Sequence, residues 1–220
     1  MKSFFTLLYK DLLCEFRTKH AIYSLLVFVL TTVLVLIFSI SDKDFSVELI
    51  SSLFWIVSFF STMTGLSRSF VLEEEKHTIM FLRLQSSVTN IYLSKLFYTI
   101  IGSLIINISI TIAFSLFLSG FIIYNYTLFA LTILIGSIAL SSAATILSAI
   151  ISRAEFKGLL FPLLSFPIML PILITSVQLT NITLTNFTFE NELNYLQFEL
   201  SYSTVLITSS LMFVKYIFEE

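Results

Sequence analysis

Long stretches without a charged residue constrain this chain more than any other feature of its sequence. No Asp, Glu, Lys or Arg occurs between Lys95 and Arg153, and shorter charge-free stretches precede and follow this one. A charge at the centre of a lipid bilayer costs several kcal/mol, so charged residues mark the segments that lie outside it. Only 12% of the residues are charged, against about 25% in ordinary soluble domains. We therefore expect an all-α integral membrane protein.

The charge-free stretches predict six membrane-spanning helices, because one span requires about 20 apolar residues. The longest stretch exceeds one helix, and Ser119, Gly120 and the tyrosines around Asn125 supply the turn that divides it. The expected spans are 21–40, 49–67, 91–118, 126–150, 159–179 and 195–218. Together they form one transmembrane domain of the ABC-exporter type over residues 1–220.

The basic residues predict how the spans are oriented, since Lys and Arg collect in cytoplasmic loops. With six spans, every basic residue falls on one face except Lys43, which lies in the first loop among acidic residues. A missing or extra span would spoil this alternation. Both termini are therefore expected in the cytoplasm.

The residues that carry catalysis or bind metals are scarce. No ionisable residue occupies the centre of an expected span, His20 and His77 both lie in cytoplasmic segments, and Cys14 is the only cysteine. No glycine is followed by lysine, so the chain lacks a P-loop for ATP. We expect no catalytic, cofactor-binding or metal-binding residue and no enzyme. The net charge of −2 also gives no basic field for nucleic acid.

The segment between the second and third spans is a candidate coupling element. Its charged residues lie in the middle and large apolar residues lie on both sides, as in an amphipathic helix in the membrane interface. A solvated turn without a partner is the alternative. Because energy from ATP must come from another subunit, we expect this segment to contact a cytoplasmic ATPase. Phe70, Met80 and Phe81 would be apolar anchors, and the acidic residues would be exposed. The candidate coupling residues are Arg68, Phe70, Glu73, Glu74, Glu75 and His77.

Two of the expected spans carry unusual residues. In the third, Ser103, Asn107, Thr111 and Ser115 recur every four residues and share a helix face. This polar stripe serves either close helix packing or a polar translocation surface.

In the fifth expected span, Pro162, Pro167 and Pro171 each remove a backbone donor, which predicts a kinked or broken helix. The alternatives are a functional break and a static kink.

The chain resembles the CcmB family, the permease subunit of the cytochrome c maturation haem exporter. Trp55, then the run Gly65-Leu66-Ser67-Arg68-Ser69-Phe70, resembles the family's tryptophan and L-x-R-x-F element, and the acidic run from Glu73 follows. Lys95 stands where the family has a lysine opening the third span. The run Phe166-Pro167-Ile168-Met169-Leu170-Pro171-Ile172-Leu173-Ile174 resembles its P-x-x-x-P-x-L-I signature. The family usually has a glycine soon after the acidic run, where this chain has His77.

The resemblance implies a multi-pass permease in the bacterial inner membrane, in an ABC-type complex. Its implied partners are a cytoplasmic CcmA-like ATPase, CcmC- and CcmD-like membrane proteins and a CcmE-like haem chaperone. The complex would export haem or use ATP to release the haem-loaded chaperone. Haem would be the cargo of the complex, with no cofactor bound directly. The rival hypotheses are the permease of another small ABC-2-type exporter, for a lipid, drug or polysaccharide, and a membrane scaffold without transport.

Overall fold

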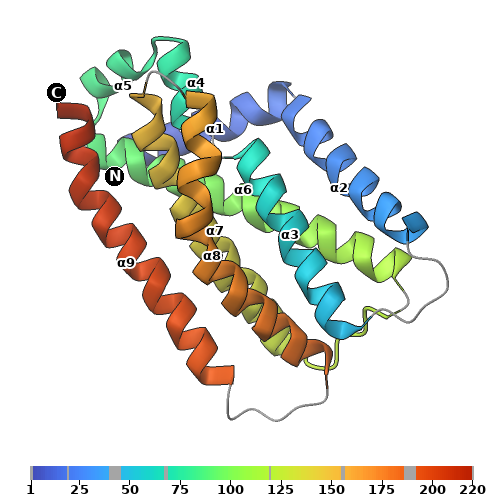
Figure 1. Ribbon diagram of the computed structural model, residues 1–220. Helices are drawn as coiled ribbons and strands as arrows, with labels where there is room; N and C mark the ends of the chain where they lie inside the picture. Colours follow the sequence, from blue (N-terminus) through green and yellow to red (C-terminus); the bar gives the residue numbers. More distant parts are fainter. Residues whose placement is uncertain are drawn as a thin grey trace.

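The computed structural model describes residues 2–18, 20–39, 46–66, 69–118, 120–154, 157–185 and 192–219. Within these ranges the chain forms helices and no strand (Figure 1). The helices are α1 (Lys2–Thr18), α2 (His20–Ser39), α3 (Val47–Gly65), α4 (Ser69–Glu75), α5 (Ile79–Gln85), α6 (Val88–Phe117), α7 (Tyr126–Ser152), α8 (Lys157–Leu184) and α9 (Glu192–Glu219). The predicted all-α class is therefore confirmed.

Five segments of the described chain are long and apolar enough to cross a membrane. They are the segment that begins with α3 and the helices α6, α7, α8 and α9. The protein is thus an integral, multi-pass membrane protein. The sixth predicted span coincides with α2, of which the described side chains supply only a shorter apolar segment, Val27–Leu36. A sixth span over α2 stays a prediction.

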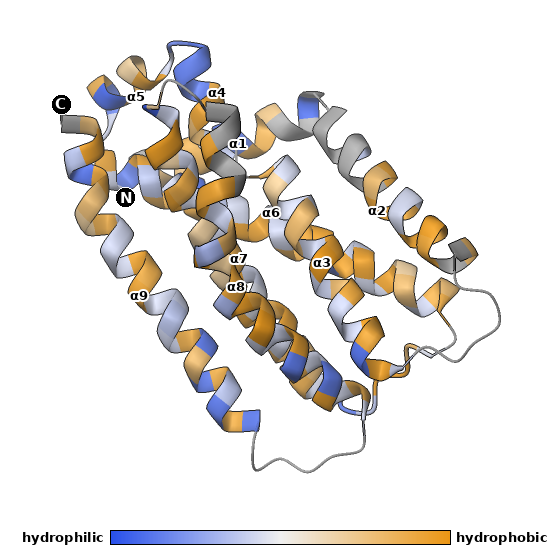
Figure 2. Ribbon diagram, in the orientation of Figure 1, coloured by the Kyte–Doolittle hydropathy of each residue, from blue (hydrophilic) through white to orange (hydrophobic). Residues whose placement is uncertain are grey.

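The connections between helices gather at two ends of the bundle. One end carries α4, α5, both ends of the chain, the end of α7 and the start of α8 (Figure 1); we call it the α4–α5 end. The last residues of α2, α6 and α8 and the first residues of α3, α7 and α9 lie at the far end. Hydrophilic residues colour the α4–α5 end and the far ends of α3, α8 and α9, while apolar residues dominate between them (Figure 2). This banding fits helices that cross an apolar layer.

Helix α7 is the centre of the bundle and contacts α3, α4, α6, α8 and α9. Small side chains allow this close approach: Ala139, Ala143 and Ala144 are fully buried. Hydroxyl groups join α7 to α6, where Thr99 Oγ1 lies 2.7 Å from Thr145 Oγ1. Such interhelical hydrogen bonds stabilise packing inside an apolar layer, where no water competes for the hydroxyls.

One contact in this core is especially close. The ring of Trp55, on α3, is fully buried and its Nε1 donates a hydrogen bond to Thr180 Oγ1 on α8, over 2.7 Å. The same ring packs against Gly136 of α7, where an added Cβ would lie 2.3 Å from Trp55 Cη2. Glycine at position 136 therefore lets α3, α7 and α8 meet around one indole.

We predict that Gly136→Ala destabilises the protein, because the new methyl overlaps a ring that is held from its other side. Overpacking of this kind costs about 1–3 kcal/mol. The measurement is thermal unfolding in mild detergent, followed by the fluorescence of Trp55, the only tryptophan in the chain.

Gly102→Ala is the matched control. Its Cβ would lie 2.5 Å from Leu66 Cδ2, the end of a flexible side chain that can move aside. Both substitutions gain the same helix propensity. The unfolding midpoint should therefore fall clearly more for Gly136→Ala, and equal midpoints would contradict the role of Trp55.

Candidate functional site

Four charged side chains join α1, α4 and α6 at the α4–α5 end. Lys95 of α6 donates hydrogen bonds to Asp11 Oδ1 on α1, over 3.1 Å, and to Glu73 Oε1 on α4, over 2.8 Å. Lys10 of α1 donates to the same Glu73 oxygen over 2.7 Å and lies 3.3 Å from Asp11 Oδ1. We call Lys10, Asp11, Glu73 and Lys95 the ion cluster. Its two cations balance its two carboxylates.

Three of the four side chains of the ion cluster lie largely out of water. The side chains of Lys95 and Asp11 are 6% and 8% exposed and that of Glu73 is 13% exposed, whereas that of Lys10 is 39% exposed. Burial alone lowers the pKa of Lys10, but its hydrogen bond to Glu73 and the nearby Asp11 outweigh burial and raise that pKa. Removing one partner of a buried ion pair costs about 3–5 kcal/mol, since the other charge stays buried. The cluster therefore holds three helices together.

A second set of contacts fixes α4 from its other side. The ring of Phe70 is buried and stacks on Tyr92 of α6 and Phe218 of α9, with centroid distances of 6.1 and 5.6 Å. The backbone N–H of Phe70 donates to Ser148 Oγ on α7 over 3.0 Å. Helix α4 thus contacts three of the long helices as well as α1, and it is positioned to move with them.

The end of α4 is a turn whose backbone favours glycine. His77 has φ 53°, in the left-handed region. The N–H of Thr78 donates to the Glu73 carbonyl over 2.9 Å, and the N–H of His77 donates to the Glu74 carbonyl over 3.0 Å. These bonds form a Schellman motif, in which the left-handed residue is usually glycine. A side chain in this conformation costs about 1–2 kcal/mol.

We predict that His77→Gly stabilises the turn by up to about 1 kcal/mol, because glycine adopts a positive φ without a steric penalty. Thermal unfolding in detergent measures the effect. His77→Val is the matched control and should lower the unfolding midpoint, since β-branched residues rarely tolerate a positive φ. A midpoint that is unchanged in both variants would contradict the motif's role.

Helix α5 presents an exposed apolar surface beyond this turn. Met80, Phe81 and Leu84 are 71%, 70% and 79% exposed, while Ile79 and Leu82 on its other side are buried. The prediction of a single amphipathic helix in this segment is thus wrong, because the turn at His77 divides the segment into α4 and α5. Its apolar residues have separate tasks: Phe70 anchors α4 inside the protein, whereas Met80 and Phe81 face outward.

The sequence model of the CcmB family, described as CcmB protein, matches residues 2–211. The chain belongs to the CcmB family. Membership of this family implies that the chain is a component of the permease of the cytochrome c maturation haem exporter. A search of the curated proteins found no match. The matched range contains the ion cluster, the turn at His77 and all of α5.

The acidic residues expected at the coupling segment of this CcmB-family chain do not form one exposed group. The side chain of Glu73 is only 13% exposed within the ion cluster, so its predicted exposure is wrong; two lysines compensate its charge there. Glu74 is 25% exposed and its Oε1 lies 3.7 Å from Arg153 Nη1. Glu75 is exposed. Arg68 lies outside the described residues.

The predicted polar stripe is only partly buried. Ser103 and Asn107 are fully buried, Thr111 is half-buried and Ser115 is exposed. Asn107 accepts a hydrogen bond from Ser58 Oγ on α3 over 2.5 Å and donates to Ser137 Oγ on α7 over 2.8 Å. This arrangement supports the packing interpretation for Asn107, because its amide joins three helices.

The prolines lie within one helix. Helix α8 runs without interruption from Lys157 to Leu184 and includes Pro162, Pro167 and Pro171. The helix is therefore not broken at these prolines, and the kink stays a prediction. Tyr202 of α9 donates its hydroxyl to the Ile168 carbonyl over 2.9 Å, on the turn that precedes Pro171. Hydrogen bonds from a neighbouring helix to carbonyls near a proline allow a helix that contains proline to persist in an apolar layer.

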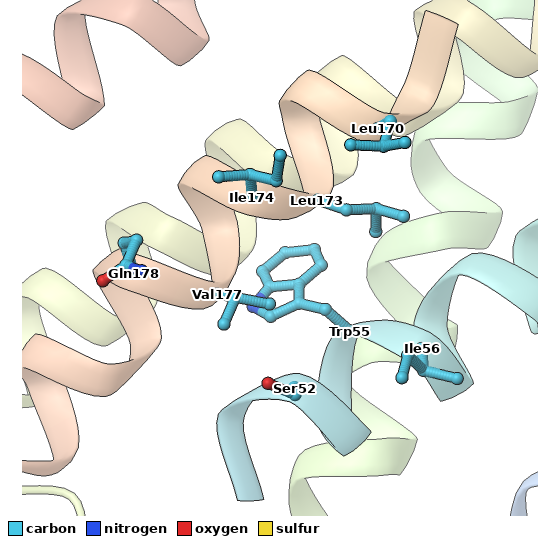
Figure 3. Close-up of a pocket in the computed structure, with 8 residues that line it drawn as sticks. All are labelled: Ser52, Trp55, Ile56, Leu170, Leu173, Ile174, Val177 and Gln178. Carbon is cyan, nitrogen blue, oxygen red and sulfur yellow. The ribbon is translucent and has the colours of Figure 1, made fainter. Parts of the chain in front are cut away.

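A groove of about 320 Å³ separates the exposed edges of α3 and α8 (Figure 3). Its wall consists of Ser52, Trp55 and Ile56 from α3 and Leu170, Leu173, Ile174, Val177 and Gln178 from α8. The Trp55 indole lies between the two helices in this view. No lining residue is ionisable, so the groove offers apolar contact rather than acid–base chemistry.

The buried carboxylates Asp11 and Glu199 were not predicted from the sequence. No pattern in the sequence singles out Asp11, because its partner Lys95 is 84 residues away. Glu199 of α9 is fully buried and accepts a hydrogen bond from Ser176 of α8. The signal for Glu199 was its spacing from Ser203 and Ser210, which places all three on one face of α9. Among the residues that the structure describes, no cluster of His, Cys, Asp or Glu could hold a metal ion.

Proposed function

We propose that this chain is the membrane permease subunit of an ABC-type complex in cytochrome c maturation, located in the bacterial inner membrane. The complex would export haem or use ATP to release a haem-loaded chaperone. Membership of the CcmB family supports the process. The helices that are long and apolar enough to cross a membrane support the membrane role.

The α4–α5 unit is the element that we assign to coupling with the ATPase. One observation carries this assignment: an exposed apolar helix, α5, follows directly on a helix that the ion cluster fixes to the bundle. A partner that binds Met80 and Leu84 would press on α4, and α4 would transmit the force through Phe70 and Lys95 to the long helices. An unanchored loop would bend and lose that force.

The orientation required by this proposal follows from the basic residues. Arg83 lies in α5 and Lys76 directly follows α4. Lys10 and Arg153 are paired with Glu73 and Glu74 of α4, so these basic residues all lie at the α4–α5 end. Since Lys and Arg collect on the cytoplasmic side, this end is expected to face the ATP-containing compartment. The ATPase would be a separate CcmA-like subunit, because this chain has no P-loop.

The remaining partners in the proposal are CcmC- and CcmD-like membrane subunits and a CcmE-like haem chaperone. Haem enters as their cargo. In this proposal, the present subunit transmits movement, whereas the other proteins ligate haem. The uncharged walls of the groove between α3 and α8 are consistent with this division.

We predict that the double substitution Met80→Ser and Leu84→Ser reduces co-purification of the ATPase by about tenfold or more. Exposed apolar anchors at the centre of an interface contribute about 1–2 kcal/mol each, and 1.4 kcal/mol corresponds to a factor of ten. The measurement is the amount of ATPase recovered with matched amounts of tagged permease extracted from membranes.

The matched control carries Ile122→Ser and Tyr126→Ser, two exposed apolar residues at the far end of the bundle. It should recover as much ATPase as the wild type. Equal recovery from both double variants, with both inserted normally, would move the coupling surface away from α5.

A further inference from the structure

A cavity of about 570 Å³ opens at the α4–α5 end, between α1, α4, α5 and α6. Its volume is within the usual range for small-molecule sites, about 300–1,000 Å³. The polar part of its lining, which we call the polar wall, includes the ion cluster, Ser69 and Lys76. The apolar part, which we call the apolar wall, includes Leu72, Phe81 and Tyr98. The cavity is therefore amphipathic, and its ligand must be so too.

The polar wall carries an excess of positive charge. Lys10, Lys76 and Lys95 line the cavity together with only two carboxylates, Asp11 and Glu73. Within the ion cluster, Lys10 and Lys95 already balance these carboxylates. Lys76 is exposed and does not belong to the cluster, so its charge remains available to an anion.

An unsatisfied hydroxyl group points to the same ligand chemistry. Ser69 is 7% exposed and lines the cavity, yet its Oγ has no hydrogen-bond partner among the described residues. A buried hydroxyl without a partner is destabilising, because it has lost its hydrogen bonds to water. An acceptor oxygen in the cavity would remove that cost, and a phosphate group beside a lysine supplies such oxygens.

The apolar wall identifies the rest of the ligand. The side chains of Phe81 and Leu72 remain 70% and 44% exposed. A free phosphate would leave this wall in water. A phospholipid would place its phosphate near Ser69 and Lys76 and its first methylenes along Leu72 and Phe81. Basic pockets between helices at the cytoplasmic surface bind anionic lipid headgroups in this manner.

We propose that this cavity binds the headgroup of an anionic phospholipid, with Ser69 and Lys76 contacting the phosphate. The lipid would link α1 to α4 beside the ion cluster. This assignment depends on the membrane location of the chain and not on the ATPase, so it can fail while the coupling proposal stands.

The chain carries its own probe for the test. Cys14 is the only cysteine, is exposed and lines the cavity. The full chain is reconstituted in nanodiscs of phosphatidylcholine alone or with added phosphatidylglycerol, and the labelling rate of Cys14 by an uncharged maleimide is measured. We expect phosphatidylglycerol to slow labelling several-fold. The double variant Ser69→Ala and Lys76→Gln should lose this protection.

Arg83→Gln is the charge-matched control, since Arg83 is an exposed cation of α5 that does not line this cavity. It should keep the protection. If phosphatidylglycerol slowed the labelling of Cys14 equally in the wild type, the double variant and Arg83→Gln, the general surface charge of the disc would explain the effect. That result would overturn the site. Equal protection by inorganic phosphate in phosphatidylcholine discs would overturn the lipid and assign a soluble phosphate compound instead.

Retained lipid gives a second readout that does not depend on cysteine chemistry. Native mass spectrometry of the detergent-extracted protein should show a phosphatidylglycerol adduct on the wild type and on Arg83→Gln. The adduct should be absent from the Ser69→Ala and Lys76→Gln double variant, whose fold is checked by its unfolding midpoint. An adduct of equal abundance on the folded double variant would contradict the assignment.

Discussion

The pairing of Lys95 with Glu73 is the interaction on which the rest of the α4–α5 end depends. A lysine near the start of a long apolar helix is costly unless a carboxylate meets it, because its charge is removed from water. Glu73 Oε1 lies 2.8 Å from the Lys95 Nζ, and Asp11 completes the pairing from α1. Because Glu73 and Asp11 must both reach Lys95, these pairings fix where α4 and α1 lie against α6. The turn at His77 then determines where α5 emerges.

The same anchoring connects the surface to the centre of the bundle. Helix α4 reaches α7 through the Phe70–Ser148 hydrogen bond and reaches α9 through the stacked ring of Phe218. Helix α7 in turn packs closely on its neighbours through small residues. A force applied to α5 therefore has a continuous path of hydrogen bonds, ring contacts and ion pairs into the apolar helices. Such a path suits a subunit that converts the motion of an ATPase into movement within a membrane.

The sequence predicts helices well here because charge is so costly in lipid that it marks their ends. The helices α3, α6, α7, α8 and α9 accordingly lie over the expected ranges within a few residues. The sequence does not reveal partners far apart in the chain, so Glu73 looked like a surface charge and Asp11 went unnoticed. Three prolines predicted a kinked or broken helix, and α8 is continuous, with Tyr202 of α9 donating to a nearby carbonyl. The family usually has a glycine soon after the acidic run, and the structure gives a local reason for it, since His77 occupies a left-handed position there.

A double-mutant cycle between Glu73→Gln and Lys95→Met tests the central claim most directly. The free energy of unfolding is measured in one detergent for the wild type, both single variants and the double variant. Residues within one ion-pair network show coupling energies of about 0.5–3 kcal/mol, whereas independent residues add within about 0.5 kcal/mol. If the pair anchors α4, each single variant should be destabilised, and the double variant should lose clearly less than both losses combined. Strictly additive losses would show that α4 is held by other contacts and would contradict the account.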